Sequence, residues 1–447
     1  MTSATPQPPG RIERAVLDAT DPGGEMMSLA AELFPLPRSL TGDGVRETLR
    51  LIGEWAPLEL TEVPSGTQAF DWTVPPEWSV REAWIRDGEG RVVVDASEST
   101  LRLVGYSAPV RARLSGAELL GHLHSLPEHP DWIPYRTTYY DRNWGFCVTE
   151  RERRSIDPGA TYDVLVDSSL EPGSLTLAEL VVPGETDEEF VVSTYTCHPS
   201  LANDNVSGLV VAAALARWLP RGALRHTVRF LFAPSVIGAL AWLQRNHERL
   251  SVVRCGLIVS CVGDRGPLRY KQSRRGTTAV DRAAALVLRD EPESLLEPFV
   301  PWGGDERQFC APGFDLAFGS LSRSSHGAYL EYHSSADDLD LIDATRLRGS
   351  LLAVTRILDV LEDDATPVGT AQLGEPQLGR RGLYGSIGTG LPTEEDRRAL
   401  LWVLNLADGT NSLVDVAERS GLPFRLIHQA AQRAREAGLV RDAADPA

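Results

Sequence analysis

The stretch Thr196-Cys-His-Pro-Ser-Leu-Ala-Asn-Asp-Asn-Val-Ser-Gly208 decides the fold of this chain. It places the imidazole of His198 and the carboxylate of Asp204 six residues apart, just after the apolar run Phe190-Val-Val-Ser-Thr194. A helix-forming run, Gly208-Leu-Val-Val-Ala-Ala-Ala-Leu-Ala-Arg-Trp218, follows the polar residues. Open α/β sheets build their binding sites where a strand ends, a polar loop follows and a helix begins. Because neutral imidazole and carboxylate are common zinc ligands, the stretch predicts a metal site at the edge of a sheet.

On both sides of this stretch, runs with the pattern of strands alternate with runs with the pattern of helices. Extended runs are expected at Leu177–Val182, Phe190–Thr194, Thr227–Phe232 and Cys255–Ser260, and helices at Val206–Leu219, Gly238–Leu250, Ala279–Leu288 and Ala344–Glu362. Strands that alternate with helices predict an α/β fold with a doubly wound, mostly parallel sheet.

The composition of the chain changes at several points and predicts more than one domain. The expected parts are a disordered N-terminus over 1–24, a catalytic α/β domain over 25–73 and 166–368, an inserted β-rich domain over 74–165, and a winged-helix-like unit over 375–447. Short apolar runs separated by turn residues predict the β-rich unit. Three short helices followed by an extended segment predict the C-terminal unit.

Bulk properties exclude several classes of protein. The chain has 42% hydrophobic and 24% charged residues, as soluble globular proteins do. No apolar run approaches the roughly 20 residues of a membrane span, and Met1–Gly10 has no apolar signal core. Five irregularly spaced cysteines predict a reducing, cytoplasmic location. The net charge of −18 disfavours broad affinity for nucleic acid or anionic membranes.

Further ligand-type side chains occur in three other segments. They are Cys261-Val-Gly-Asp264 after the strand that ends near Ser260, Asp305-Glu306 in a Gly-rich loop, and Glu331-Tyr-His333. Loops from different strands meet at one edge of a doubly wound sheet, so these segments are expected to approach His198.

Two of these motifs carry a family resemblance. His198-Pro…Asn-Asp204-Asn-x-Ser-Gly and Tyr332-His333-Ser-Ser-Ala-Asp resemble the first and last ligand motifs of the co-catalytic zinc aminopeptidase and glutamate-carboxypeptidase clan. In that clan the His binds one zinc ion and the Asp bridges two. The resemblance implies a zinc-dependent hydrolase of a peptide or amide bond, with a carboxylate that takes a proton from water.

A bacterial branch of aminopeptidase-like proteins is more similar still. Its members carry an inserted β-rich domain and a winged-helix tail, so the resemblance covers nearly the whole chain. The shared phrases are Arg38-Ser-Leu-Thr-Gly-Asp-Gly-Val-Arg-Glu47, Val63-Pro-Ser-Gly-Thr67, Asp71-Trp-Thr-Val-Pro, Cys261-Val-Gly-Asp and Gly304-Asp-Glu-Arg-Gln-Phe-Cys310.

The chain departs from the clan at Pro234-Ser-Val-Ile-Gly238. The clan has a Glu-Glu pair there, a general base followed by a zinc ligand, whereas this chain has Ser235 and Val236. Serine has no useful basicity at neutral pH without a partner, and valine cannot bind a metal. The clan's later zinc-binding Asp falls near Cys261.

The matched ligands that remain are His198, Asp204 and His333, a set that holds a single zinc ion with an open position. The sequence therefore predicts one zinc ion per chain. An active enzyme needs a replacement base, for which Glu331 and Glu306 are the candidates. Glu331 is preferred because a residue two positions before His333 on an extended segment shares its face.

The leading hypothesis is a metal-dependent, aminopeptidase-like hydrolase of a small peptide or amino-acid conjugate, with the inserted domain covering the site. The first alternative is an inactive or repurposed scaffold that binds a small molecule or a protein partner. The second is a DNA-binding regulator that uses the winged-helix tail. Its third helix carries four basic side chains, Arg425, His428, Arg433 and Arg435. DNA readers usually show a denser basic face, so docking or homo-oligomer formation is the preferred role of the tail.

Overall fold

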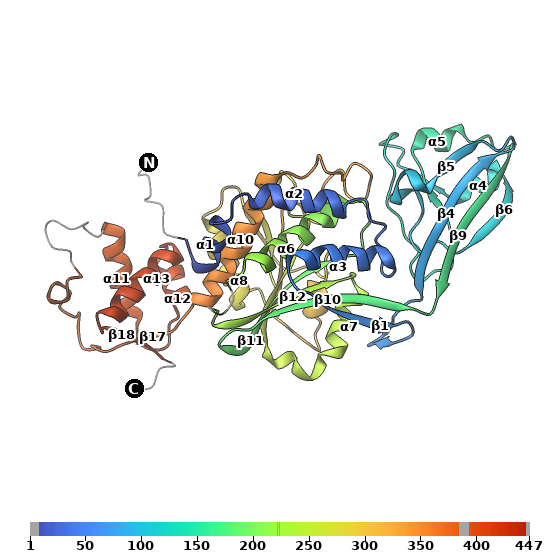
Figure 1. The fold of residues 1–447 in the computed structure, drawn as a ribbon. Coiled ribbons are helices and arrows are strands. Elements are labelled where there is room, and N and C mark those ends of the chain that lie inside the picture. Colours follow the sequence, from blue (N-terminus) through green and yellow to red (C-terminus); the bar gives the residue numbers. More distant parts are fainter. Residues whose placement is uncertain (1–8, 221, 223, 384–392, 444–447) are drawn as a thin grey trace.

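A computed structural model of the chain describes residues 9–220, 222, 224–383 and 393–443. Three units follow one another along the molecule: a small helical unit at one end, an α/β domain in the middle and a β-rich unit at the other end (Figure 1). Within the described residues, no helix is both long enough and apolar enough to cross a membrane.

The middle domain is built on an eight-stranded sheet. In spatial order its strands are β1 (Glu59–Pro64), β10 (Ser174–Val182), β12 (His226–Ala233), β11 (Thr186–Tyr195), β13 (Val253–Val259), β16 (Phe318–Ser322), β14 (Arg269–Lys271) and β15 (Leu295–Glu297). The central strands β12, β11, β13 and β16 are parallel to one another. Strands β1 and β10 pair antiparallel with their neighbours, and β14 is antiparallel to β16 but parallel to β15. The predicted α/β fold with a mostly parallel sheet is confirmed.

Helices cover both faces of this sheet. One face packs against α1 (Arg11–Leu17), α2 (Pro22–Leu33), α3 (Asp43–Trp55), α6 (Ser207–Trp218), α8 (Ala279–Arg289) and α10 (Ala344–Asp363). The other face packs against α7 (Ile237–Arg245) and α9 (Glu306–Phe309). Strand β11 serves both cores, because Phe190 and Val192 point to the first and Val191 to the second, as alternation along a strand requires.

The N-terminal segment corrects one prediction. Disorder over residues 1–24 is wrong from Arg11 onward, where α1 begins, while residues 1–8 lie outside the described part of the chain. Ile12 and Val16 are fully buried, and the Asp359 carboxylate on α10 accepts hydrogen bonds from Ile12 N at 2.9 Å and Glu13 N at 3.0 Å. The capping carboxylate lies 347 residues from Ile12 in sequence, so the segment's own composition does not reveal the cap.

The inserted unit has a sheet and a core of its own. Its strands run in the order β5 (Val92–Asp95), β4 (Glu77–Asp87), β9 (Thr161–Glu171) and β6 (Val110–Ser115). Smaller elements are α4 (Gly116–Leu119), β7 (Leu123–His124), β8 (Phe146–Cys147) and α5 (Glu150–Ser155). The short pair β2 (Gln68–Ala69) and β3 (Trp72–Thr73) precedes the insertion and packs on α7 of the α/β domain. Strand β9 continues through a short turn into β10 of the main sheet, so the insertion reaches Glu171 instead of 165.

The C-terminal unit contains α11 (Glu394–Leu406), α12 (Leu413–Ser420), α13 (Phe424–Glu436) and a two-stranded wing of β17 (Pro367–Gly369) and β18 (Val440–Asp442). It docks against the α/β domain, where Arg282 of α8 forms ion pairs with Asp415 at 2.7 Å and Glu418 at 2.6 Å.

Candidate metal centre

The site residues lie at the carboxyl edge of the parallel strands. Asp204 follows β11, Ser235 follows β12, Cys261 follows β13, and His326 and His333 follow β16. Parallel strands bring their carboxyl ends to one edge, so residues from four separate segments meet there.

The three predicted metal ligands form one cluster. The donor atoms of His198, Asp204 and His333 all lie within 4.8 Å of one another. Asp204 Oδ2 lies 3.0 Å from His333 Nε2 and 3.9 Å from His198 Nε2. Asp204 Oδ2 and His333 Nε2 are both buried and neither makes a hydrogen bond of acceptable geometry, although they are close enough to each other to form an ion pair. Two nitrogens and one carboxylate oxygen that face each other in this way fit a zinc ion.

The surroundings of His198 and Asp204 keep both side chains in the protonation state that binds a metal. Burial lowers the pKa of His198 to about 4, although Asp204 opposes this shift, so the imidazole is neutral at physiological pH. Burial alone raises the pKa of Asp204, but His198 and His333 outweigh it and hold that pKa well below its usual range. A neutral imidazole and an ionised carboxylate bind a metal without first losing a proton.

Asp337 holds the Asp204 loop in place. Its carboxylate accepts hydrogen bonds from Asn203 N at 2.5 Å, Asp204 N at 3.0 Å and the Tyr329 hydroxyl at 2.8 Å. Asn203 in turn donates to Asp264 Oδ2 at 2.7 Å. Asp264 therefore positions the loop that carries Asp204, as Asp337 does.

A second cluster shares Asp204 with the first. It consists of Asp204, Cys261 and His326, whose donor atoms also lie within 4.8 Å of one another. The hydroxyl of Tyr195, at the end of β11, donates a short hydrogen bond to Asp204 Oδ1 and lies 3.1 Å from His326 Nε2 and 3.9 Å from Cys261 Sγ. Neither His326 nor Tyr195 was among the site residues predicted from the sequence.

Asp305 contacts Ser235, the residue that aligns in sequence with the clan's general base. Ser235 Oγ donates to Asp305 Oδ1 at 2.7 Å. Cys197 lies between this pair and the predicted metal ligand His198, since its Sγ is 3.6 Å from Ser235 O and 3.3 Å from His198 Nδ1. Burial raises the pKa of Asp305 to about 7, and the hydrogen bond from Ser235 only partly offsets that rise.

The two carboxylates predicted as bases have different surroundings. Glu306 is fully buried and forms an ion pair with Lys271 Nζ at 2.5 Å. It also lies near His326, because a Cβ on Gly304 would lie 2.8 Å from Glu306 Oε2 and 3.6 Å from His326 Cε1. Glu331 lines a surface hollow of about 320 Å³ together with Asp264 and Tyr329, and none of the three predicted ligands lines that hollow. The catalytic roles of Glu306 and Glu331 stay predictions.

The inserted unit covers the cluster with Tyr135. Tyr135 N donates to His333 O at 2.7 Å, and its ring centroid lies 5.3 Å from that of His198 and 5.1 Å from that of His333. Ser335 N also donates to Ile133 O at 2.8 Å. Backbone hydrogen bonds therefore join the insertion directly to the loop that carries His333.

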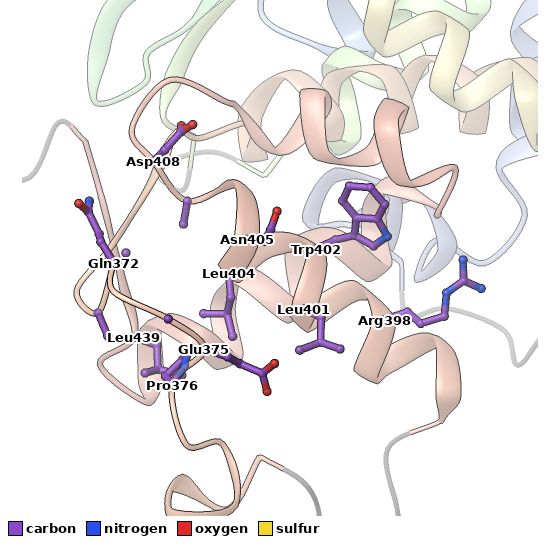
Figure 2. Close-up of a pocket in the computed structure, with 14 residues that line it drawn as sticks. Gln372, Glu375, Pro376, Arg398, Leu401, Trp402, Leu404, Asn405, Asp408 and Leu439 are labelled. Carbon is purple, nitrogen blue, oxygen red and sulfur yellow. The ribbon is translucent and has the colours of Figure 1, made fainter.

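Two hollows in the molecule lie at different distances from this centre along the chain's three units. One of about 310 Å³ lies between the insertion and the α/β domain, and its lining includes Arg38, Tyr135 and Pro199 beside the ligand cluster. A larger one, of about 730 Å³, lies in the winged-helix unit and is lined by Leu401, Leu439 and neighbouring residues (Figure 2). None of the three predicted ligands lines either hollow, but the first approaches them through Tyr135, whose ring lies beside both histidines, and through Pro199, the residue after His198.

The α/β domain has an aminopeptidase-like fold. Within that class, the chain belongs to the family whose model is described as a domain of unknown function (DUF4910), which matches residues 27–364. A model described as a winged helix-turn-helix matches residues 365–442.

Similar proteins span the full architecture. The chain is 42% identical over 421 residues, 94% of its own length and 96% of the relative's, to a Clostridium acetobutylicum protein. The name of that relative assigns it provisionally to polysaccharide biosynthesis and gives it an aminopeptidase-like domain. A crystal structure from the same organism, described provisionally as a peptidase, matches with a TM-score of 0.89 at 40% identity, covering 96% of this chain and 98% of that one.

More distant structures share the fold alone. BSAP, a zinc aminopeptidase from Bacillus subtilis, matches with a TM-score of 0.58 at 11% identity, covering 75% of this chain and 94% of that one. A peptidase M28 precursor from Shewanella amazonensis matches with a TM-score of 0.55 at 12% identity, covering 79% and 95%.

Proposed function

We propose that this protein is a hydrolase that uses one zinc ion to cleave the amide bond of a small peptide or amino-acid conjugate. The observation that carries the proposal is the pair Asp204 Oδ2 and His333 Nε2, which face each other at 3.0 Å without a hydrogen bond. Buried polar atoms are normally satisfied, and a cation held by these two atoms and His198 satisfies both. Zinc bound there supplies a Lewis acid that polarises the scissile carbonyl and lowers the pKa of water.

We assign the general base to Asp305. Its Oδ1 accepts from Ser235 Oγ, so Oδ2 is the oxygen that takes the proton from the attacking water. A pKa of about 7 suits a group that must accept and then return a proton near neutral pH. Serine at position 235 thus acts by orienting a carboxylate that another loop supplies.

The inserted unit covers the site, which favours a small substrate. Tyr135 lies over both histidine ligands, and the adjacent hollow of about 310 Å³ is at the lower end of the range for small-molecule sites, roughly 300–1,000 Å³. The name of the Clostridium relative refers to polysaccharide biosynthesis, so aminoacyl derivatives of amino sugars belong among the substrates to be tested.

The winged-helix unit is proposed to be a docking module, either within the chain or between copies of it. The basic side chains of α13 are engaged with carboxylates: Arg425 and His428 with Asp363, Arg433 with Asp396, and Arg435 with Asp442. These ion pairs weigh against the DNA-binding alternative, which needs arginines that face phosphates. The five free, buried cysteines agree with the cytoplasmic location expected from the sequence.

An inactive scaffold is the second candidate, because Ser235 and Val236 stand where the clan has its Glu pair. A panel of aminoacyl anilides, dipeptides and aminoacyl amino sugars separates the two. We expect the purified wild-type protein to hydrolyse at least one of them, to lose that activity with a chelator and to regain it with zinc. Hydrolysis that occurs only after Ser235→Glu would instead favour the scaffold.

A further inference from the structure

We infer that the Tyr195 hydroxyl occupies the position of a second metal ion, and that it restricts the centre to one ion. This inference rests on the proposed function, because it takes the cluster of His198, Asp204 and His333 as the zinc site. It concerns the second cluster, Asp204, Cys261 and His326, which has metal-ligand chemistry of its own.

The two clusters differ in whether their donor atoms have partners. In the first, Asp204 Oδ2 and His333 Nε2 are buried without a hydrogen bond. In the second, Asp204 Oδ1 accepts from the Tyr195 hydroxyl, and His326 Nε2 lies 3.1 Å from the same oxygen. A phenol both donates and accepts, so a proton on His326 Nε2 completes the chain from His326 through Tyr195 to Asp204.

The hydroxyl also touches the third member of the cluster. Its oxygen lies 3.9 Å from Cys261 Sγ, so it contacts every donor of the second cluster. Tyr195 is 3% exposed and is anchored at the end of a central strand. Its oxygen therefore fills the space between the three donors, and a metal there would have to displace a buried side chain.

The Gly-rich loop lies beside His326 on the side of Nδ1. A Cβ built on Gly303 would lie 3.3 Å from His326 Nδ1 and 3.0 Å from Lys271 Nζ, and one on Gly304 would lie 2.8 Å from Glu306 Oε2. A side chain at Gly303 would therefore crowd the imidazole and Lys271, and one at Gly304 would crowd Glu306. The two adjacent glycines leave room for these groups.

Each carboxylate oxygen of Asp204 then has a separate partner. Oδ1 is bound by Tyr195, and Oδ2 is left for the metal ion beside His333. Tyr195 is then a positioning residue that sets the orientation of the shared carboxylate.

Cobalt binding tests this inference with a readout that does not depend on catalysis. The metal-free wild-type protein is titrated with Co²⁺, and bound cobalt per chain is measured together with the thiolate-to-cobalt charge-transfer absorption in the near ultraviolet. We expect one cobalt ion and no thiolate band, because Cys261 is not a ligand. Tyr195→Ala should bind a second ion and gain the band, and Tyr195→Ala with Cys261→Ala should lose the band.

Tyr135→Ala is the matched control, because its ring lies 5.3 Å from the His198 ring and that of Tyr195 lies 5.2 Å from it. This variant should stay at one ion without the band. Two cobalt ions in the wild type, or a single ion with a thiolate band, would overturn the inference even if Tyr195→Ala did not fold. A wild type that binds no cobalt would instead refute the proposed zinc site.

Discussion

Asp204 belongs to two clusters of metal-ligand residues that are built on the same edge of the sheet but differ in one respect. The cluster with His198 and His333 leaves buried donor atoms without a hydrogen bond, whereas the donors of the cluster with Cys261 and His326 are contacted by the Tyr195 hydroxyl. Residue types alone therefore do not define a metal site. The two clusters differ in whether a protein group already satisfies their donor atoms.

Loss of a ligand from the open cluster should have the largest effect. His198→Ala removes one of three donors, so we expect bound zinc to fall from one ion per chain to none and hydrolysis to be abolished. The matched change in the closed cluster, His326→Ala, should retain one zinc ion. Elemental analysis of both purified variants checks this, and full zinc in His198→Ala would contradict the assignment.

Removal of the proposed base should come next. Asp305→Asn keeps the hydrogen bond with Ser235 feasible but cannot accept a proton, so we expect kcat to fall by about 10²–10⁴-fold. Zinc content should not change, which separates this effect from ligand loss. Glu331→Gln is the control and should leave kcat within a factor of a few. A larger loss of kcat in Glu331→Gln than in Asp305→Asn would instead identify Glu331 as the general base.

The pH dependence gives an independent test of the same group. Burial raises the pKa of Asp305 to about 7, and only its ionised form accepts a proton. Activity should therefore rise with pH up to about 7 and then level off, and it should fall about tenfold per unit on the acid side. A kcat profile that is flat between pH 5 and 8 would exclude Asp305 as the base.

Residues that position the open cluster should have a moderate effect. Asp337→Asn weakens the acceptor for Asn203 N and Asp204 N, and changes of this kind typically cost about 10–100-fold in metal affinity. Competition with a zinc chelator measures the loss. Asp340→Asn, at an exposed position three residues on, should bind zinc as tightly as the wild type does.

The smallest effect is expected in the closed cluster. Cys261→Ala removes a side chain that Tyr195 separates from the metal, so zinc content should stay at one ion per chain and kcat/KM should change little. Loss of zinc from this variant would show that the thiol is a ligand and would remove the contrast between the clusters.

The sequence predicted the parts of this centre that are local. His198 and Asp204 lie within one strand-loop-helix segment, and His333 carries a motif of its own. The alternation of apolar runs also predicted the central strands and the helices that cover them. These signals arise from neighbouring residues and need no knowledge of distant contacts.

The remaining residues depend on contacts that sequence patterns do not encode. Strand β16 has only five residues, and all are buried, so it shows no alternation. Because that strand was not predicted, no sequence pattern placed His326 at the edge of the sheet. Tyr195 meets His326 across 131 residues, and Asp305 meets Ser235 across 70, so both roles appear only once the loops are assembled.

An anomalous difference map from crystals of the zinc-loaded wild-type protein, collected at the zinc absorption edge, tests the central claim most directly. The account predicts one peak per chain, bounded by His198, Asp204 and His333, with the Tyr195 hydroxyl still bound to Asp204 Oδ1. A peak beside Cys261 and His326, or no peak at the first cluster, would contradict it.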